Sequence, residues 1–276
     1  MRNLKIFNKI SEIKDFINNS KKLNKKIGFV PTMGCLHDGH LALIKEAKKN
    51  ADIVIVSIFI NKPQFNDLKD YELYPQNLES DAKMLEEANV DVLFYPLASE
   101  IYGEDFSFKI VPTAMIDCLC AKDRVGHFDG VALIITKLFN IVNPNCAFFG
   151  EKDFQQLAII KKLVKDLNFD VKISGVETVR ESSGLAMSSR NQRLSEAGKI
   201  KAPMLYKILN EIKLNPQIIE EKKAQLIANG FEKIDYLEIR NEENLKLNIN
   251  LFSSQKRRIF IAVYLEGVRL IDNLSL

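Results

Sequence analysis

Residues 27–40, IGFVPTMGCLHDGH, are the stretch from which the fold can first be predicted. The segment opens with a short apolar run over residues 27–30, as expected for a buried strand. Gly34 and Gly39 then lie in a turn where the backbone can approach a ligand closely, and residues 41–50 have a helical pattern. This order predicts a strand that turns into a helix, which is the first half of a strand–helix–strand unit.

The same alternation continues through the N-terminal part of the chain. Residues 53–59 form a nearly continuous β-branched run, which is typical of a strand covered on both faces. Further strands are predicted at residues 92–95, 146–149 and 171–175, and helices at residues 10–22, 78–88, 131–142 and 154–167. We therefore predict an α/β fold with a doubly wound parallel sheet.

The sequence changes character after residue 177. A loop rich in small residues, RESSGLAMSSRN, is followed by predicted helices at residues 196–213 and 216–229. Two strands, residues 258–265 and 268–271, then meet at a tight turn. Helices followed by an antiparallel hairpin indicate a smaller α+β domain, so we expect domains at residues 1–177 and 178–276.

Composition and charge exclude several classes of protein. Hydrophobic residues make up 46% of the 276 residues and charged residues 27%, which is a globular mixture and not a disordered one. The longest apolar runs have strand length, so no membrane span is expected. The net charge is only +3 and is not gathered on one element, so no nucleic-acid partner is expected. Four cysteines without a CxxC pair, in a chain without a signal-peptide core, predict a cytoplasmic protein.

The two histidines of HDGH are the strongest candidates for chemistry. His37 and His40 are three residues apart, so both can project from one side of the first helical turn. Backbone N–H groups and the positive end of the helix dipole converge there, which suits a phosphate. Structural caps and a metal pair are the alternative interpretations, but a metal would require more ligands than Asp38 adds. The stretch matches neither a Walker loop nor a GxGxxG fingerprint.

Polar side chains also follow two of the predicted strands. Asn61 and Gln64 come directly after the β-branched run, and ligands bind beyond the carboxyl ends of parallel strands. After a later strand, Gly150 opens a turn in which Lys152 offers a cation to a phosphate and Asp153 can accept from a ribose hydroxyl. Ordinary turn chemistry would also explain these residues.

Two further groups of polar residues have more than one interpretation. Gln155 and Gln156 begin the next predicted helix, and only one of them is expected to face a ligand. Ser188, Ser189 and Arg190 form a donor-rich loop that by itself could be a linker. The residues alone leave both questions open.

Together these motifs carry a resemblance to a known family. HDGH resembles the HxGH signature of the nucleotidyltransferase superfamily, whose members attack the α-phosphate of ATP. The motifs PTMGxLHxGH, FxNxxQF, YPxxLxxD, GHFDGV, KLFNIVxP, FGxKDxQQ and GLAMSSRN occur here in the order found in pantoate–β-alanine ligases. They extend from residue 31 almost to the closing GVRLIDN, so the chain is identified as a member of that family.

The resemblance implies a reaction and an architecture. Pantoate would react with ATP to give pantoyl adenylate and pyrophosphate, and β-alanine would then displace AMP to give pantothenate. Pantoate, β-alanine and ATP would be the partners of this chain, Mg²⁺ would accompany ATP, and two copies would form a homodimer. The architecture implied is a Rossmann-like ATP domain followed by a smaller C-terminal α+β domain that covers the site as a lid.

The resemblance also implies roles for individual residues. His40 matches the residue usually assigned as proton donor, although charge stabilisation would explain the same position, and His37, Lys152 and Arg190 complete the catalytic set. Gln64, Gln156 and Asn61 match the residues that hold pantoate and β-alanine. The implied ATP-binding residues are Met33, Gly34, Cys35, Leu36, His37, Asp38, Gly39, His40, Gly150, Glu151, Lys152, Asp153, Val179, Met187, Ser188, Ser189 and Arg190.

Several positions depart from the family pattern. Gln76 replaces the arginine usual after YP, Val125 replaces the proline usual before GHF, and Ser183 replaces an acidic residue. Asp81 matches a family carboxylate expected near the metal. The departures affect loops and leave the implied catalytic residues unchanged.

Two other functions fit parts of the pattern less well. Adenylyl transfer to a phosphorylated acceptor would need a basic acceptor pocket, whereas Gln64 and Gln156 suit a neutral polyol acid better. A catalytically silent nucleotide-binding protein would not be expected to keep both HDGH histidines, Lys152 and Arg190.

Overall fold

The computed structural model describes residues 4–248 and 254–276, and the chain forms two compact units. The first unit contains the residues up to Pro112 together with Val125–Gly150 and Ile159–Val176. The second contains Thr113–Arg124, Glu151–Ala158 and Glu177–Leu276. The domain limits expected from the sequence stay a prediction, and each unit is described by itself.

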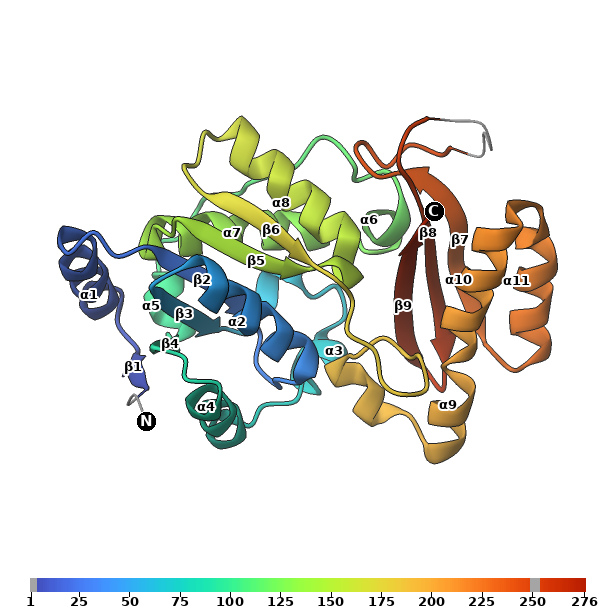
Figure 1. Cartoon of the computed structure of the whole chain (residues 1–276), viewed down its shortest axis with the longest axis horizontal. Coiled ribbons are helices and arrows are strands. Elements are labelled where there is room, and N and C mark those ends of the chain that lie inside the picture. The colour runs from blue at the N-terminus through green and yellow to red at the C-terminus, as the bar shows by residue number, and fades with distance from the viewer. Residues whose placement is uncertain (1–3, 249–253) are drawn as a thin grey trace. The chain divides into compact units, whose positions relative to one another are not determined.

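The first unit is built on a six-stranded parallel sheet with the order β1-β4-β3-β2-β5-β6 (Figure 1). The strands are β1 (Lys5–Phe7), β2 (Ile27–Thr32), β3 (Ile53–Ile58), β4 (Val92–Phe94), β5 (Cys146–Gly150) and β6 (Lys172–Val176). The strand order reverses at β2, which has β3 on one side and β5 on the other. The predicted doubly wound parallel sheet is therefore confirmed, and its switch point lies beside the HDGH segment.

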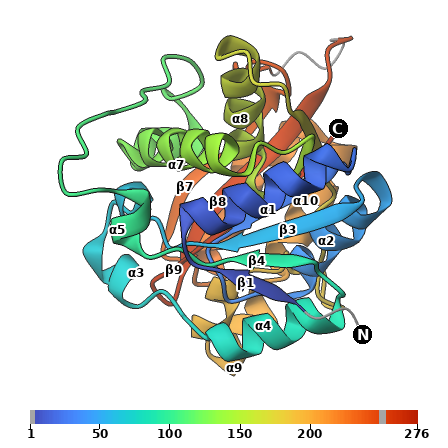
Figure 2. The same ribbon diagram turned by 90° about the vertical axis from the view of Figure 1, so that its left-hand side faces the viewer.

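Helices cover both faces of this sheet. On one face, α2 (Asp38–Asn50) and α4 (Leu78–Glu87) pack in one hydrophobic cluster with Val30 of β2. The neighbouring Phe29 contacts Phe139 of α7 (His127–Val142), and side chains of consecutive strand residues point to opposite faces. The helix α7 and its neighbour α1 (Ile10–Lys22) therefore cover the other face (Figure 2).

The first unit also contains short elements that periodicity did not predict. They are β1, η1 (Lys62–Gln64), α3 (Leu68–Glu72) and α5 (Ala98–Ile101). A hydrophobic period cannot be recognised over only three to five residues, so elements this short leave no pattern in the sequence. The chain also contains η2 (Glu151–Asp153) and α8 (Phe154–Asp166), which follow β5.

The second unit contains a three-stranded antiparallel sheet with the order β7-β8-β9. Its strands are β7 (Lys233–Asn241), β8 (Arg257–Leu265) and β9 (Val268–Ser275), and its other elements are α6 (Leu119–Asp123), η3 (Ser189–Arg193), α9 (Glu196–Lys201), α10 (Met204–Leu214), η4 (Pro216–Ile218) and α11 (Ile219–Ala228). Buried Ile208 and Leu209 of α10 share one core with Ile259 and Ile261 of β8. The predicted α+β character is confirmed.

Two details of the second unit differ from the sequence expectation. The single helix expected over residues 196–213 is two helices, α9 and α10, with Pro203 preceding α10. Proline cannot donate a helical backbone hydrogen bond, so a break there is the physical consequence. The last strand extends to Ser275, because its register against β8 continues beyond residue 271.

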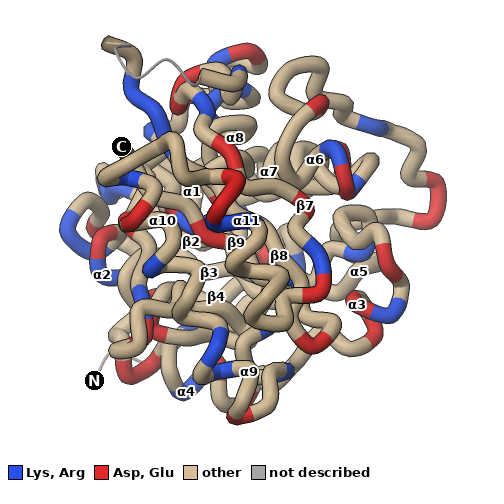
Figure 3. The backbone as a smooth tube through the Cα atoms, turned by 90° about the vertical axis from the view of Figure 1, so that its right-hand side faces the viewer, with Lys and Arg blue, Asp and Glu red and all other residues tan. Residues whose placement is uncertain are grey.

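Charged residues of both signs are spread over the chain. Figure 3 shows Lys and Arg interspersed with Asp and Glu along the chain. Within the described ranges, none of the helices combines the length and the apolar character that crossing a bilayer would require.

Candidate active site

The HDGH histidines cap the helix that they begin. His37 is the N-cap of α2, and its Nδ1 accepts from the backbone N–H of Gly39 at 3.1 Å. The Nδ1 of His40 accepts from the backbone N–H of His37 at 3.2 Å, and the two ring centroids are 4.2 Å apart. Because each Nδ1 is an acceptor, the proton of each neutral ring belongs on Nε2. The cap and phosphate interpretations are therefore compatible, since the capping contacts use Nδ1 of each ring and not Nε2.

The turn before HDGH is held by Asp81 of α4. Its Oδ2 accepts from the backbone N–H of Cys35 and its Oδ1 from that of Leu36, both at 2.8 Å, and the carboxylate is buried. Gly34 and Cys35 both have left-handed backbone, with φ of 81° and 52°. Such a conformation is unusual for a non-glycine residue, and the two hydrogen bonds offset its strain. Asp81 thus fixes the backbone that leads into the histidines.

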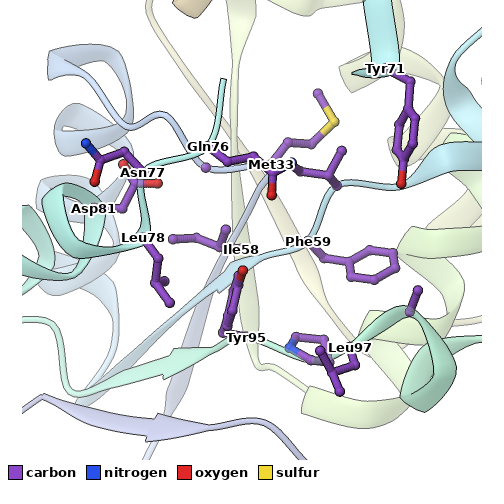
Figure 4. A pocket seen from close by; sticks show the side chains of 14 residues that line it. Met33, Ile58, Phe59, Tyr71, Gln76, Asn77, Leu78, Asp81, Tyr95 and Leu97 are labelled. Atoms are coloured by element: carbon purple, nitrogen blue, oxygen red, sulfur yellow. The ribbon is translucent and has the colours of Figure 1, made fainter. Parts of the chain in front are cut away.

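A pocket of about 180 Å³ adjoins this turn (Figure 4). Its lining includes Met33, Gly34 and Asp81, and apolar residues such as Phe59, which directly follows β3. Gln76, which stands where the family usually has arginine, also lines this pocket. With an amide at this position, Asp81 is the charged residue among those that line the pocket.

Asn61 and Gln64 belong to one buried hydrogen-bond network in the first unit. The Nδ2 of Asn61 donates to Oε1 of Gln64 and to the carbonyl of Gly130, both at 3.0 Å. The hydroxyl of Tyr102 donates to Oδ1 of Asn61 at 2.6 Å. Every hydrogen-bonding group of the Asn61 amide is thus engaged, so in this structure Asn61 orients Gln64. Burial raises the pKa of Tyr102, which keeps its hydroxyl protonated as a donor.

The third histidine supports the same segment. Nδ1 of His127 donates to the carbonyl of Gln64 at 2.6 Å, because a carbonyl can only accept. At Gly130 of the same helix, an added Cβ would lie 2.6 Å from backbone atoms of Pro63 and of Gln64. The GHFDGV motif therefore serves as the surface against which the Gln64 segment packs, and Gln64 in turn donates to Sδ of Met33 at 3.0 Å.

The second unit holds the other candidate residues. Lys152 and Asp153 lie in η2, and their side chains are 19% and 50% exposed, with Nζ and Oδ2 4.0 Å apart. Gln155 donates through Nε2 to the carbonyls of Met115 and Cys118 at 2.8 and 2.9 Å and is buried. Gln155 is therefore the structural member of the pair, and the half-buried Gln156 stays the candidate for a ligand.

The serine-rich loop is a short hairpin within the second unit. The backbone N–H of Met187 donates to the carbonyl of Val179 at 3.0 Å, and Ser188 caps η3 by accepting from the N–H of Arg190 at 3.3 Å. Arg180 holds the hairpin through a two-pronged ion pair with Asp272, at 2.6 and 2.9 Å. The SSR segment is thus an anchored loop and not a linker.

Comparison with known proteins decides the family. Residues 5–275 match the model of the pantoate-beta-alanine ligase family. The chain is 44% identical over 280 residues to a pantothenate synthetase of Caldicellulosiruptor bescii, covering 98% of each, and 46% identical over 282 residues to one of Carboxydothermus hydrogenoformans, covering 99% of each. The chain belongs to the pantoate–β-alanine ligase family.

Solved structures of the family share this fold. Pantothenate synthetase of Thermus thermophilus matches with a TM-score of 0.91 at 38% identity, over 98% of this chain and 99% of that one. The Francisella tularensis ligase, solved with beta-gamma ATP and beta-alanine, matches with a TM-score of 0.88 at 40% identity, over 99% and 98%. The chain is therefore a ligase that condenses pantoate with β-alanine to pantothenate, with ATP as substrate.

The structure distributes the predicted site residues between the two units. Met33 to His40, Asn61, Gln64 and Gly150 lie in the first unit, and Glu151 to Asp153, Gln156, Val179 and Met187 to Arg190 in the second. Their contacts with substrates stay predictions. Sequence reasoning missed Tyr102 and the structural use of His127, and only the GHFDGV motif signalled the latter.

Proposed function

We propose that this ligase works through a pantoyl-adenylate intermediate, with the paired Nε2–H groups of His37 and His40 at the α-phosphate. A carboxylate oxygen of pantoate would attack the α-phosphorus of ATP, and the bond to the bridging oxygen would break, so that pyrophosphate leaves with the electron pair. The amine of β-alanine would then attack the acyl carbon, AMP would leave, and the amine would lose a proton. The observation that carries this proposal is the two-histidine cap of α2.

The histidines would act as preorganised donors. Charge grows on the phosphate oxygens as the new P–O bond forms, and fixed N–H groups stabilise that charge without reorganising. The capping contacts lock both rings, and the N-terminus of α2 adds the positive end of its helix dipole. Stabilisation by His40 would require no net proton transfer, which is why we favour it over proton donation.

The remaining contacts follow the same chemistry. Lys152 and Arg190 would neutralise phosphate oxygens, Ser188 and Ser189 would donate to them, and Asp153 would accept from ribose. The backbone at Val179 and Met187 would complete the nucleotide site. Gln64 and Gln156 would bind the hydroxyl and carboxylate groups of pantoate, with Asn61 orienting Gln64.

Mg²⁺ would enter as part of MgATP. Among residues 4–248 and 254–276, no three His, Cys, Asp or Glu side chains cluster so that they could hold a metal ion. Both oxygens of Asp81 already accept backbone N–H groups. The described residues therefore do not fit a protein cage for Mg²⁺, and phosphate oxygens and water would supply its ligands.

The association state and the location are also proposals. We expect a homodimer, because residues 103–109 are exposed throughout and include Phe108, whose exposed fraction is 76%. Sedimentation of the wild type as a dimer, and of Phe108→Ser as a monomer, would support this; a monomeric wild type at micromolar concentration would refute it.

All four cysteines are free thiols, which supports a location in the reducing cytoplasm. We also propose that the second unit covers bound ATP as a lid.

An isotope experiment tests the intermediate. Pantoate labelled with ¹⁸O in its carboxylate is incubated with the enzyme, MgATP and β-alanine, and AMP is examined by mass spectrometry. Attack through an adenylate transfers one labelled oxygen to AMP, and pantoate should also support exchange of pyrophosphate into ATP without β-alanine. Unlabelled AMP would exclude the adenylate, and adenylate formation without pantothenate would point to adenylyl transfer instead.

A further inference from the structure

Two buried residues of the C-terminal sheet contact the backbone of the Lys152 turn within the second unit. Nδ2 of Asn273, on β9, donates to the carbonyls of Glu151 and Lys152, both at 2.9 Å. On β8, Nη1 of Arg258 donates to Oδ1 of Asn273 at 2.6 Å, and Nη2 donates to Oε2 of Glu151 at 3.2 Å. The sequence separates Asn273 from Lys152 by 121 positions.

These contacts use the amide of Asn273 completely. Its two N–H groups reach two carbonyls, and its oxygen accepts from the guanidinium of Arg258. Arg258 is itself fixed, because Nε donates to Glu242 at 2.9 Å and the guanidinium lies over the ring of Phe154 at 4.0 Å. The exposed fractions of Asn273 and Arg258 are 3% and 7%, so the network is buried and removing one of its members should be costly.

The positions of the two carbonyls determine which part of the backbone the Asn273 amide holds. The peptide planes that carry the carbonyls of Glu151 and Lys152 are those on either side of the Lys152 Cα. An amide that bridges both carbonyls therefore restricts both backbone dihedral angles of Lys152 and sets the direction of its side chain. The turn η2 spans only three residues, Glu151–Asp153, so it has little internal hydrogen bonding to do this itself.

We propose that Asn273, held by Arg258, is the positioning residue for Lys152 in ATP binding. The proposal rests on the proposed function, in which Lys152 contacts a phosphate. Lysine has a long, flexible side chain, so a fixed backbone reduces the disorder that binding must remove. Asn273 touches no reacting atom in this scheme and acts through Lys152 alone.

A matched pair of variants separates this role from simple stability. Asn273→Ala removes the two N–H donors to the carbonyls and the oxygen that accepts from Arg258. Asn273→Asp keeps an oxygen for Arg258 but places a second carboxylate oxygen, which cannot donate, toward the two carbonyls. Asn241→Ala is the control, because Asn241 is an equally buried amide on β7 whose oxygen accepts from the N–H groups of Glu243 and Asn244. Lys152→Ala serves as the reference for loss of the phosphate contact.

The readout is the KM for ATP beside kcat, the KM for β-alanine and the melting temperature, all in the full-length enzyme. We expect both Asn273 variants to raise the KM for ATP about tenfold, since displacing a binding group by about 1 Å is enough for such losses. The KM for β-alanine should stay unchanged. Asn241→Ala should lower the melting temperature comparably without moving the KM for ATP.

The outcomes distinguish the two levels of the proposal. If Lys152→Ala raises the KM for ATP but Asn273→Ala and Asn273→Asp behave like Asn241→Ala, the positioning role is wrong and the proposed function stands. If Lys152→Ala itself leaves the KM for ATP unchanged, the phosphate role of Lys152 is wrong and the positioning role falls with it. Should Asn273→Ala fail to fold, Arg258→Lys must raise the KM for ATP without changing the KM for β-alanine. An unchanged KM for ATP in Arg258→Lys would overturn the inference.

Discussion

The two units hold their candidate site residues in different ways. In the first unit, the candidate side chains are themselves fixed: the histidines cap α2, and Gln64 is bound to Asn61 and Met33. In the second unit, Asn273 of β9 fixes the backbone at Lys152, and the side chains of Lys152 and Asp153 remain partly exposed.

The difference matches the chemistry expected of each group. Donors that stabilise a developing charge must not move during the reaction, so buried networks suit the histidines and amides. Long cations that neutralise phosphates need only a fixed starting point, because their charge acts over a longer distance. We therefore expect substitutions that disturb the histidines or Gln64 in the first unit to change adenylation or pantoate binding, and substitutions around Lys152 in the second unit to change the affinity for ATP.

The largest effect is expected at His40. His40→Ala should lower the rate of pantoate-dependent pyrophosphate–ATP exchange on the order of 10²–10³-fold, the range for loss of one preorganised donor. His40→Gln provides the control, because glutamine at this position can still accept from the N-cap backbone. It should recover the roughly 1 kcal/mol of helix capping in a urea titration. Because the glutamine amide also carries N–H groups, recovery of the exchange rate as well would show that a neutral donor suffices and would exclude proton donation by His40.

A second test disturbs the support of Gln64. In Gly130→Ala the new methyl group would meet backbone of Pro63 and Gln64 at 2.6 Å, where nothing flexible can yield. Overpacking of this kind destabilises by about 1–3 kcal/mol, and the displaced Gln64 should raise the KM for pantoate. Gly103→Ala is the matched control, since nothing lies within 4 Å of its Cβ. An unchanged KM for pantoate in Gly130→Ala would separate Gln64 from pantoate binding.

A third test removes one hydrogen bond from the buried network. Tyr102→Phe leaves Oδ1 of Asn61 without its phenolic donor, which should lower the free energy of unfolding by about 1–3 kcal/mol. Burial raises the pKa of Tyr102, so the neutral donor persists above the ordinary phenol range. The difference in stability between wild type and variant should therefore be constant from neutral to mildly alkaline pH. A difference that disappears within that range would show that the hydroxyl ionises there.

The smallest effect concerns Cys35 in the turn before HDGH. Burial, and then the charge of Asp81, raise the pKa of this thiol. A raised pKa favours the neutral thiol, so at mildly alkaline pH the thiolate fraction is below that of an unperturbed cysteine. Iodoacetamide should alkylate Cys35 more slowly than free cysteine, as followed by peptide mass spectrometry. Buried Cys118, whose pKa burial raises to about 11, is the internal reference for an inert thiol. Faster alkylation of Cys35 than of free cysteine would contradict the assignment.

The regular elements were more predictable than the contacts. The β-branched run that became β3 and the strand–turn–helix of β2 and α2 predicted the parallel sheet, because burial on two faces leaves a local apolar signature. Short β1 and α5 carry no such signature and were missed. The choice between Gln155 and Gln156 also lay beyond the sequence, because adjacent helix positions differ only in what surrounds them.

The sequence by itself determined the order of elements, the glycine turn before HDGH and membership of the family, since these depend on neighbouring residues and motif order. Only the tertiary structure decided that Asn61 binds Tyr102 and that Asn273 bridges the carbonyls beside Lys152. Buried polar groups must find partners wherever the fold brings them. Those partners lie tens of residues or more away, at separations that no local pattern encodes.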